Sequence, residues 1–215
     1  MGDVIAVVGL RREAAVLRGL GVRTIAGGGA AQRLADELAD LAKDAAGIIS
    51  FGMAGALAPD LGLGDWVIAD RVGDFACDPR WIAALSHRLP NARIGPVHAD
   101  GRLIADPAEK ANLNRASGSL AADMESHIVA AVAASAGLPF AVLRCISDDA
   151  GSALPPAIAV AMKPGGGLAL GAVFGSLAAN PRQIPGLVRT VAGFNRAYRA
   201  LGAGARQAGQ RMAFP

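Results

Sequence analysis

Three carboxylates stand where a folded α/β chain could use them for chemistry. Asp148 follows an apolar run over residues 140–146, which has the length of a strand that is buried on both faces. Glu125 lies near the start of an expected helix over residues 123–136, and Glu13 lies just past the first apolar run of the chain. Ligands of open α/β sheets bind at the carboxyl ends of the strands. The three side chains are therefore candidates for ligand binding and acid–base chemistry.

The same residues also have a simpler interpretation. Asp148 could cap the turn that follows it, and Asp123, Glu125 and Glu13 could stabilise helix starts through the helix dipole. The positions of these carboxylates alone do not decide between a chemical role and a capping role. The residues around them along the chain have to decide it.

Two stretches of small residues follow expected strands. Residues 27–29, all glycine, come after the strand expected over 22–26 and could offer backbone N–H groups to an anion or a ribose. A tight turn with close packing is the alternative, because the stretch matches neither the dinucleotide pattern nor the P-loop pattern. Residues 52–56 come after the strand expected over 47–51, and their small side chains would let a ligand approach the backbone closely.

Apolar runs and helical periodicity alternate along the chain, which predicts an α/β fold. The expected strands span residues 4–8, 22–26, 47–51, 66–69, 93–98 and 140–146. The expected helices span residues 11–17, 30–41, 80–89, 123–136 and 168–177, and a last helix starts between Pro181 and Pro185. Gly137 and Pro139 end the fourth of these helices.

The composition is that of one folded domain, which we expect to span residues 1–215. Hydrophobic residues make up 53%, but Gly, Pro or charged residues interrupt every apolar stretch before it reaches the length of a membrane span. The first ten residues lack the basic start of a signal peptide, so a cytoplasmic location is expected. The two cysteines and three histidines match no disulfide framework or metal motif, so neither a metal nor a bound cofactor is expected.

Charge is divided unevenly along the chain. All 18 acidic residues lie at or before Asp149, whereas residues 150–215 carry seven basic residues, a formal charge of +7 against −4 before them. On the last expected helix, arginines share one side and apolar residues the other. These are Arg182, Arg189, Arg196, Arg199 and Arg206 against Leu187, Val191, Phe194, Tyr198 and Leu201. This apolar, basic segment either covers the core with its arginines in water or contacts an anionic membrane.

Five stretches, in this order, resemble the purine and uridine phosphorylase superfamily, and among its branches the methylthioadenosine/S-adenosylhomocysteine nucleosidases. They are GLRREA (9–14), GGGAAQRLADEL (27–38), FGMAGALAPDLGLGDWVIAD (51–70), DMES (123–126) and LRCISDDA (143–150). The similarity covers residues 4–150. It implies a three-layer fold with a central mixed sheet flanked by helices, and cleavage of the N-glycosidic bond of a nucleoside.

The resemblance also implies a role for each carboxylate. Asp148 corresponds to the acid that protonates the leaving purine at N7, with Ser147 positioning it. Glu125 corresponds to the residue that binds the ribose hydroxyls, with Met124 packing against the sugar. Glu13 corresponds to the base that orients and deprotonates the attacking water. The other candidates for the substrate pocket are Met53, Ala54, Gly55, Leu103 and Ile104.

Two features depart from the family pattern. Residues 17–27 leave no room for a hairpin that the family usually has there, so the site is expected to be more open. The family commonly has Ser or Thr at the position of Met53, where the hydroxyl helps to hold phosphate. If inorganic phosphate attacks instead of water, the available cations are Arg11, Arg12 and Arg102. Met53 and Glu13 together favour hydrolysis.

Within the superfamily the chain is most similar to the hopanoid-associated phosphorylases, through SFGMAGAL, ADMES and the Pro- and Gly-rich tail. This subgroup implies release of adenine from adenosylhopane, an adenosine with a polycyclic lipid at its 5′ carbon. A methylthioadenosine/S-adenosylhomocysteine nucleosidase or another purine nucleoside phosphorylase is the alternative, and a non-catalytic nucleoside-binding or membrane-associating protein is a third. We expect a homo-oligomer, namely a dimer, with peripheral contact to the inner face of the membrane and no nucleic-acid partner.

Overall fold

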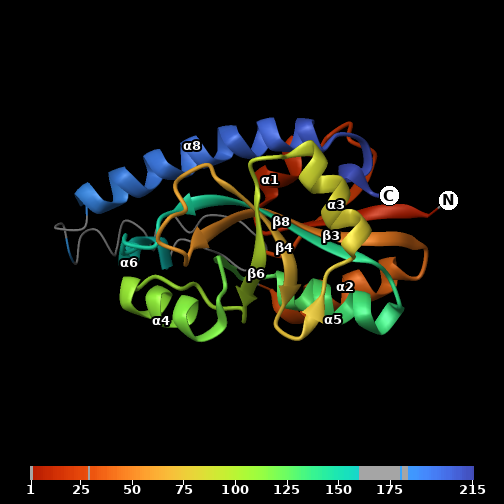
Figure 1. Cartoon of the computed structure of the whole chain (residues 1–215), viewed down its shortest axis with the longest axis horizontal. Helices are drawn as coiled ribbons and strands as arrows, with labels where there is room; N and C mark the ends of the chain where they lie inside the picture. Colours follow the sequence, from red (N-terminus) through yellow and green to blue (C-terminus); the bar gives the residue numbers. More distant parts are fainter. Residues whose placement is uncertain (1, 29, 160–179, 181–183) are drawn as a thin grey trace.

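The computed structural model describes residues 2–28, 30–159, 180 and 184–215. Its strands are β1 (Asp3–Val8), β2 (Val22–Ala26), β3 (Ala45–Ala56), β4 (Trp66–Val72), β5 (Phe75–Ala76), β6 (Arg93–Ala99), β7 (Ala121–Asp123) and β8 (Phe140–Asp148). Its helices are α1 (Arg11–Val16), α2 (Ala31–Ala42), α3 (Pro79–Arg88), α4 (Pro107–Ser117), α5 (Ser126–Ala136), α6 (Pro156–Ala159) and α8 (Ile184–Ala208), with a short 3₁₀ turn, η2 (Gln210–Ala213). The expected α/β fold with a central mixed sheet flanked by helices is confirmed (Figure 1).

The sheet closes on itself around β3. This strand pairs in parallel with β1 and β8 and antiparallel with β7. β8 then pairs with β4, β4 with β6, and β6 with β7, so five strands form a ring from which β1 and β2 extend. β8 is central to this ring, and all nine of its residues are buried. Burial raises the pKa of the Cys145 thiol in this strand to about 12, as expected for a cysteine that serves as a small apolar core residue.

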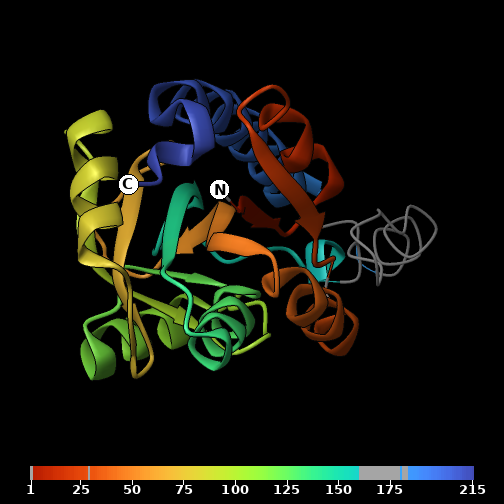
Figure 2. The same cartoon turned by 90° about the vertical axis from the view of Figure 1, so that its right-hand side faces the viewer.

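Helices surround the strands, as the end-on view in Figure 2 shows. One group of buried side chains lies beneath α2 and α5 and includes Leu34, Leu38 and Val129. A second group lies beneath α3 and α8 and includes Trp81 and Leu201. The strands between these two groups are therefore apolar on both faces, which explains why they read as continuous apolar runs rather than alternating ones.

β3 is longer than the sequence predicted. The strand was expected to end at residue 51, but residues 52–56 continue it and pair with β8 and β7. The glycines and alanines there fit a strand that has neighbours on both sides. This pairing brings Gly55 opposite Asp148, so the two sequence motifs meet at one edge of the sheet.

The helix that was expected to begin at Asp123 begins at Ser126 instead. Asp123 ends β7, and its Oδ1 accepts hydrogen bonds from the backbone N–H groups of Glu125 (2.8 Å) and Ser126 (2.7 Å). This contact occupies donors that a helix start leaves without partners. The expected end at Gly137 is confirmed, because this glycine adopts the left-handed conformation, with φ 65°.

Helix α4 is absent from the sequence-based expectations. Its start carries a clear signal, since the Asp106 carboxylate accepts from the N–H groups of Ala108 and Glu109, and Pro107 occupies the first turn. Gly118 ends the helix in the left-handed conformation. The helix could not be predicted from periodicity, because its apolar residues do not recur at helical spacing.

The last helix, α8, lies against β8 and covers the core with Ala197, Leu201 and Ala205. The arginines that the structure describes with their side chains (Arg196, Arg199 and Arg206) are exposed, as the helical pattern predicted. Val191 was placed on the apolar face, but 46% of it is exposed, because the first turns of α8 extend past the core. The predicted helix over residues 168–177, Lys163 and Arg182 lie outside the described residues.

Candidate active site

One pocket collects most of the predicted site residues. It lies at the ends of β3, β7 and β8 and is closed by α1, α8 and the loop after β6. The predicted residues that line it are Glu13, Met53, Ala54, Gly55, Arg102, Leu103, Ile104, Met124, Glu125, Ser147 and Asp148. Arg11 and Arg12 do not line it, and both are exposed.

Glu13 projects into this pocket from the first turn of α1 and is 3% exposed. Its Oε2 accepts from the N–H of Leu10 at 2.8 Å, and its Oε1 accepts from the N–H of Met53 at 2.9 Å. Burial raises the pKa of Glu13, and these two hydrogen bonds oppose the rise in part. The result is a fixed carboxylate that accepts a proton more readily than an exposed glutamate does.

The Glu125 carboxylate lies beside Gly9, as the Glu13 carboxylate does. A side chain at Gly9 would place its Cβ 3.3 Å from Glu125 Oε2 and 3.4 Å from Glu13 Oε2, so only glycine leaves this space open. Burial and, second, the neighbouring Asp123 carboxylate raise the pKa of Glu125 to about 7. Two carboxylates with raised pKa values therefore converge on one small volume.

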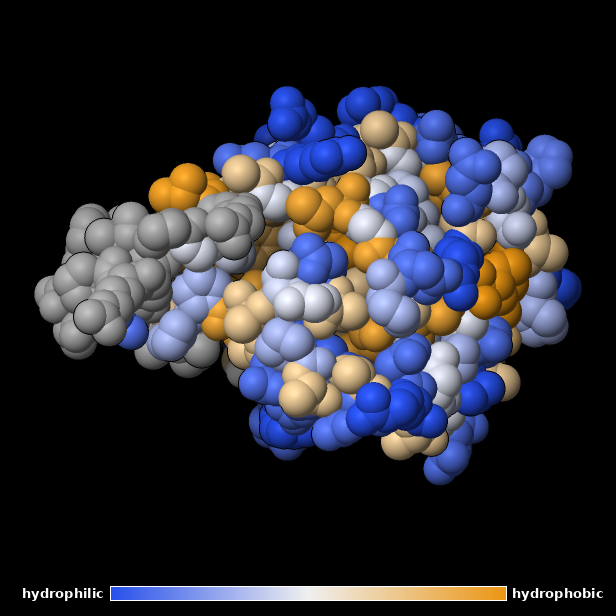
Figure 3. Space-filling model, turned by 60° about the vertical axis from the view of Figure 1, so that its left-hand side comes forward, coloured by the Kyte–Doolittle hydropathy of each residue, from blue (hydrophilic) through white to orange (hydrophobic). Residues whose placement is uncertain are grey.

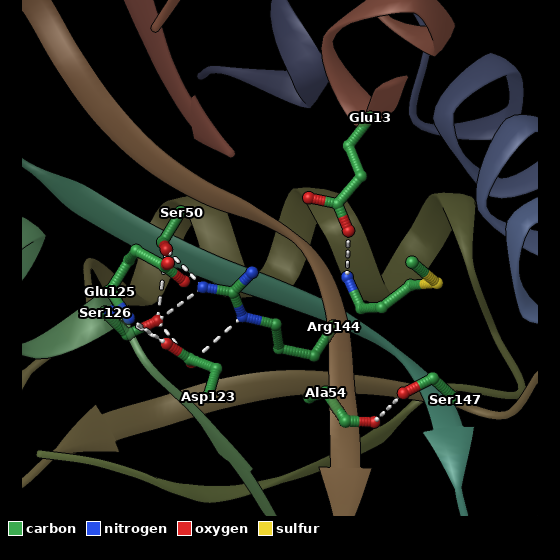
Figure 4. A network of polar contacts seen from close by, with 9 residues as sticks. Glu13, Ser50, Ala54, Asp123, Glu125, Ser126, Arg144 and Ser147 are labelled. Atoms are coloured by element: carbon green, nitrogen blue, oxygen red, sulfur yellow. Dashed lines mark hydrogen bonds and ion pairs between the residues drawn. The ribbon is translucent and has the colours of Figure 1, made fainter. Parts of the chain in front are cut away.

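Arg144 is a buried cation behind these carboxylates. Its Nε donates to Asp123 Oδ2 at 3.0 Å, and its Nη2 donates to the hydroxyls of Ser50 and Ser126. Figure 4 shows the guanidinium directed towards this cluster, with Glu13 to one side. A Cβ at Gly52 would lie 2.9 Å from Arg144 Nη1 and 3.1 Å from both oxygens of Glu13, so the guanidinium faces the Glu13 carboxylate across Gly52.

Asp148 lies at the end of β8 and is 9% exposed. Its Oδ2 accepts from Lys110 Nζ at 2.6 Å, and its Oδ1 accepts from the Ser147 hydroxyl at 2.8 Å. The expected positioning contact from Ser147 is therefore present, and Lys110 adds a second contact. A side chain at Gly55 would place its Cβ 2.9 Å from Asp148 Oδ2, so Gly55 is needed where β3 passes this carboxylate.

The candidate phosphate-binding arginines have other partners. Arg102 lines the pocket, but its guanidinium pairs with Asp100 at 2.8 Å and with Glu109 at 3.0 Å. The Arg12 guanidinium lies 4.7 Å from the centre of the Tyr198 ring. The buried cation near Glu13 is Arg144. It belongs to the motif LRCISDDA, but the sequence predicted no role for it.

Gly27 and Gly28 do not offer free N–H groups to the site, and Gly27 instead leaves space for Glu125. The N–H groups of Gly27 and Gly28 donate to the carbonyls of Val8 (2.8 Å) and Gly9 (3.0 Å), so they are not free for a ligand. A Cβ at Gly27 would lie 2.9 Å from Glu125 Cγ. At Gly27 the close-packing interpretation is therefore correct, and this glycine packs against Glu125.

The rest of the pocket wall is apolar. Four large side chains from separate parts of the chain contribute to it, namely Leu10, Leu57, Leu154 and Phe194. Among the residues that the structure describes, no three His, Cys, Asp or Glu side chains are arranged to hold a metal ion together. In the same residues, no helix is long and apolar enough to cross a bilayer.

Lys110 and Arg144 are two buried charged residues of the site that sequence reasoning missed, besides the apolar residues of the wall. Arg144 had a signal in the sequence, because a charge inside an apolar strand has to find a partner when it is buried. Lys110 could be found only once α4 was recognised, since its partner Asp148 is 38 residues away.

The fold is shared with several solved enzymes. The futalosine hydrolase of Helicobacter pylori superposes with a TM-score of 0.65 at 15% identity, over 96% of each chain. The methylthioadenosine/S-adenosylhomocysteine nucleosidase of the same organism gives 0.63 at 14% identity, again over 96% of each chain. The S-adenosylhomocysteine nucleosidase of Streptococcus pyogenes gives 0.60 at 19% identity, over 94% of this chain and 95% of the other.

Sequence comparison gives the family. No curated protein sequence matches significantly. The profile of the Phosphorylase superfamily matches residues 10–159, more than two thirds of the chain. This agrees with the expected glycosyl-bond-cleaving enzyme. By this match, and with the site carboxylates inside or next to the matched region, the chain belongs to the phosphorylase superfamily.

Proposed function

We propose that the protein hydrolyses the N-glycosidic bond of a 5′-substituted adenosine and releases adenine. One observation supports this most directly: Glu13 and Glu125 converge beside Gly9 in the pocket that Asp148 also lines. Cleavage at C1′ needs a base for the attacking water, an anion near the cationic ribose and an acid for the leaving purine. These three carboxylates can take the three roles.

The roles follow from the surroundings of each group. A water beside Gly9 gives its proton to Glu13, and its oxygen forms the new bond to C1′ as the bond from C1′ to N9 breaks. The electron pair of the broken bond goes to the purine, which takes a proton at N7 from Asp148. Glu125 accepts hydrogen bonds from the ribose hydroxyls and stabilises the positive charge that develops on the sugar.

Water is preferred to phosphate as the attacking group. Met53 has no hydroxyl for a phosphate, and its backbone N–H is bound to Glu13. Arg102 is neutralised by two carboxylates, and Arg144 by Asp123, so neither offers an unpaired positive charge to a phosphate dianion. Phosphorolysis remains the rival reaction.

The proposed 5′ group is a polycyclic lipid, which makes adenosylhopane the proposed substrate. The apolar wall formed by Leu10, Leu57, Leu154 and Phe194 suits an apolar substituent. The rival substrates are methylthioadenosine, S-adenosylhomocysteine and futalosine, which fit the names of the structural neighbours.

A single assay tests the reaction and the substrate. The protein is incubated with adenosylhopane, methylthioadenosine, S-adenosylhomocysteine and futalosine, each with and without phosphate. Free purine and the sugar product are followed by chromatography. We expect adenine and a free sugar from adenosylhopane at the same rate in both buffers. A sugar 1-phosphate formed only with phosphate would overturn hydrolysis, and a clear preference for a small substrate would overturn the lipid proposal.

We also propose reversible contact of α8 with an anionic membrane. Val188 and Val191 are 63% and 46% exposed on the first turns of this helix, and Arg196 and Arg199 are exposed just beyond them. The face of the molecule drawn in Figure 3 carries hydrophobic and strongly hydrophilic residues side by side. Basic side chains near an anionic surface contribute about 1 kcal/mol each.

Vesicle co-sedimentation tests the membrane contact. We expect binding to vesicles that contain an anionic lipid at low salt, and release at high salt because the attraction is screened. The double variant Arg196→Gln, Arg199→Gln should bind less, whereas Arg80→Gln on the exposed side of α3 should bind like the original protein. Absence of binding to anionic vesicles at low salt would overturn this proposal. The expected dimer stays a prediction, which analytical ultracentrifugation of the protein without vesicles would test.

A further inference from the structure

Lys110 is a fully buried lysine with no place in the roles given above. It lies in the second turn of α4, and its ammonium group has three acceptors. Nζ lies 2.6 Å from Asp148 Oδ2, 2.9 Å from the carbonyl oxygen of Asp149 and 3.3 Å from the carbonyl oxygen of Ser152. Three acceptors match the three protons of a charged ammonium, whereas a neutral amine has only two.

The ammonium therefore fixes the Asp148 carboxylate from one side. Ser147 donates to the other carboxylate oxygen, and Gly55 on β3 leaves the space in which Oδ2 lies. Contact with a cation favours the ionised form of a carboxylate. The carboxylate that the proposed reaction needs as its acid is thus held by a buried cation on one oxygen and by a hydroxyl on the other.

We propose that Lys110 is a positioning residue that acts through Asp148. It holds the carboxylate in one orientation, and it sets the pH range in which Asp148 carries the proton that the leaving purine takes. This inference rests on the proposed function, since it concerns the acid of that reaction.

Other charges face Asp148, but they do not replace Lys110. Glu13, Asp123, Glu125 and Arg102 line the same pocket, and Asp149 lines the cavity next to it with Asp148. Arg102 is the other cation among these, and it is 61% exposed at its side chain and paired with Asp100 and Glu109. Lys110 is the buried cation in direct contact with Asp148.

Helix α4 has supports that do not involve Lys110. Asp106 caps its start, and Leu113 packs against Leu57, Ile104 and Ala122. We therefore expect α4 to keep its place when the charge of Lys110 is removed. This separates an effect on Asp148 from a general loss of structure.

The test compares Lys110→Met, which removes the charge, with Lys110→Arg, which keeps it, and with Lys43→Met on the surface as the control. In Lys110→Met the alkaline limb of kcat/KM should move up by about one pH unit or more, because a buried carboxyl without its cation keeps its proton to higher pH. The plateau should fall about tenfold, because the carboxyl is no longer held in place. Lys110→Arg should keep the original limb. If Lys110→Met does not fold, Lys110→Gln replaces it.

Adenine binding, measured by calorimetry across pH, reports on the same pair without turnover. Lys110→Met should shift the pH dependence of binding, and it should cause no further shift when Asp148 is already Asn. The inference would be overturned if Lys110→Met changed neither the pH profile of kcat/KM nor the pH dependence of adenine binding. It would also be overturned if Lys110→Met shifted adenine binding equally when Asp148 is already Asn. If no nucleoside is cleaved, the proposed function fails, while the binding profiles still decide the role of Lys110.

Discussion

Two buried carboxylates line the same pocket and each pairs with a buried cation, but they differ in how many hydrogen bonds they accept. Asp123 accepts four hydrogen bonds, two on each oxygen, from the N–H groups of Glu125 and Ser126, the Ser126 hydroxyl and Arg144. A carboxylate offers about four acceptor sites, so Asp123 has none left for a ligand. Asp148 accepts one bond on each oxygen, from Lys110 and Ser147, and keeps sites free.

The difference separates a structural carboxylate from a reactive one. Both are buried, both pair with a cation, and both line the pocket. Burial and charge pairing alone would therefore rank them equally as candidates for catalysis. The count of occupied acceptor sites distinguishes them.

The largest effect is expected at the reactive carboxylate. Asp148→Asn keeps the shape of the side chain and loses the proton, so the rate of purine release should fall by roughly 10³-fold. Circular dichroism and thermal unfolding should show an intact fold. Asp149→Asn, the next residue, is the matched control and should keep most of the activity. A near-normal rate for Asp148→Asn would remove Asp148 from the acid role.

The structural pair should affect stability instead. Arg144→Met leaves the Asp123 carboxylate buried without its cation, which should lower the free energy of unfolding by about 3–5 kcal/mol. Urea unfolding measures this change. The double variant Arg144→Met, Asp123→Asn should recover part of the loss, because the unpaired charge is gone. If the single and double variants were equally destabilised, charge pairing would not explain the effect.

Glu125 should matter more to the transition state than to substrate binding. Glu125→Gln removes the negative charge near the cationic ribose, so kcat should fall about 100-fold while KM changes little. Steady-state kinetics on the preferred substrate measure both constants. Glu37→Gln, on the exposed side of α2, is the control. A raised KM with unchanged kcat would contradict the assigned role.

The smallest effect concerns stability and pH. The pKa of Glu125 is raised from 4.5 to about 7, so between these values the folded protein binds a proton that the unfolded chain has released. Stability therefore falls as pH rises through this window, and the loss is complete above it. Glu125→Gln lacks this group, so its unfolding free energy relative to the original protein should increase by up to about 3 kcal/mol from pH 4.5 to pH 8. A difference that does not vary with pH would show that Glu125 is not held protonated by the fold.

Much of the fold was predictable because its strands are apolar on both faces and end in glycine or polar residues. The strand over residues 22–26 was predicted to the residue, and the helix end at Gly137 was also correct. The start of α5 was not, because it depends on the bonds from Asp123 to the backbone rather than on periodicity. The ring closure was not predictable either, since β7 has only three residues.

The site was predictable where a single side chain carries the signal. Glu13, Glu125 and Asp148 stand at strand or helix ends, and the structure brings all three to one pocket. The partners of these carboxylates were not predictable, because Lys110 and Arg144 come into contact with them only through the tertiary fold. The need for glycine at positions 9 and 27 was not predictable either, because it arises from the Glu125 side chain that packs beside them in the fold.

The closed ring of strands also governs how slowly the site can open. β8 has a paired strand on each side, β3 and β4, and all nine of its residues are buried. An amide in such a strand exchanges its hydrogen only when the whole domain unfolds, whereas the exposed first turns of α8 exchange through local fraying. Arg144, Ser147 and Asp148 all belong to β8. We therefore expect the residues of the proposed catalytic site on β8 to be among the slowest to exchange in the chain.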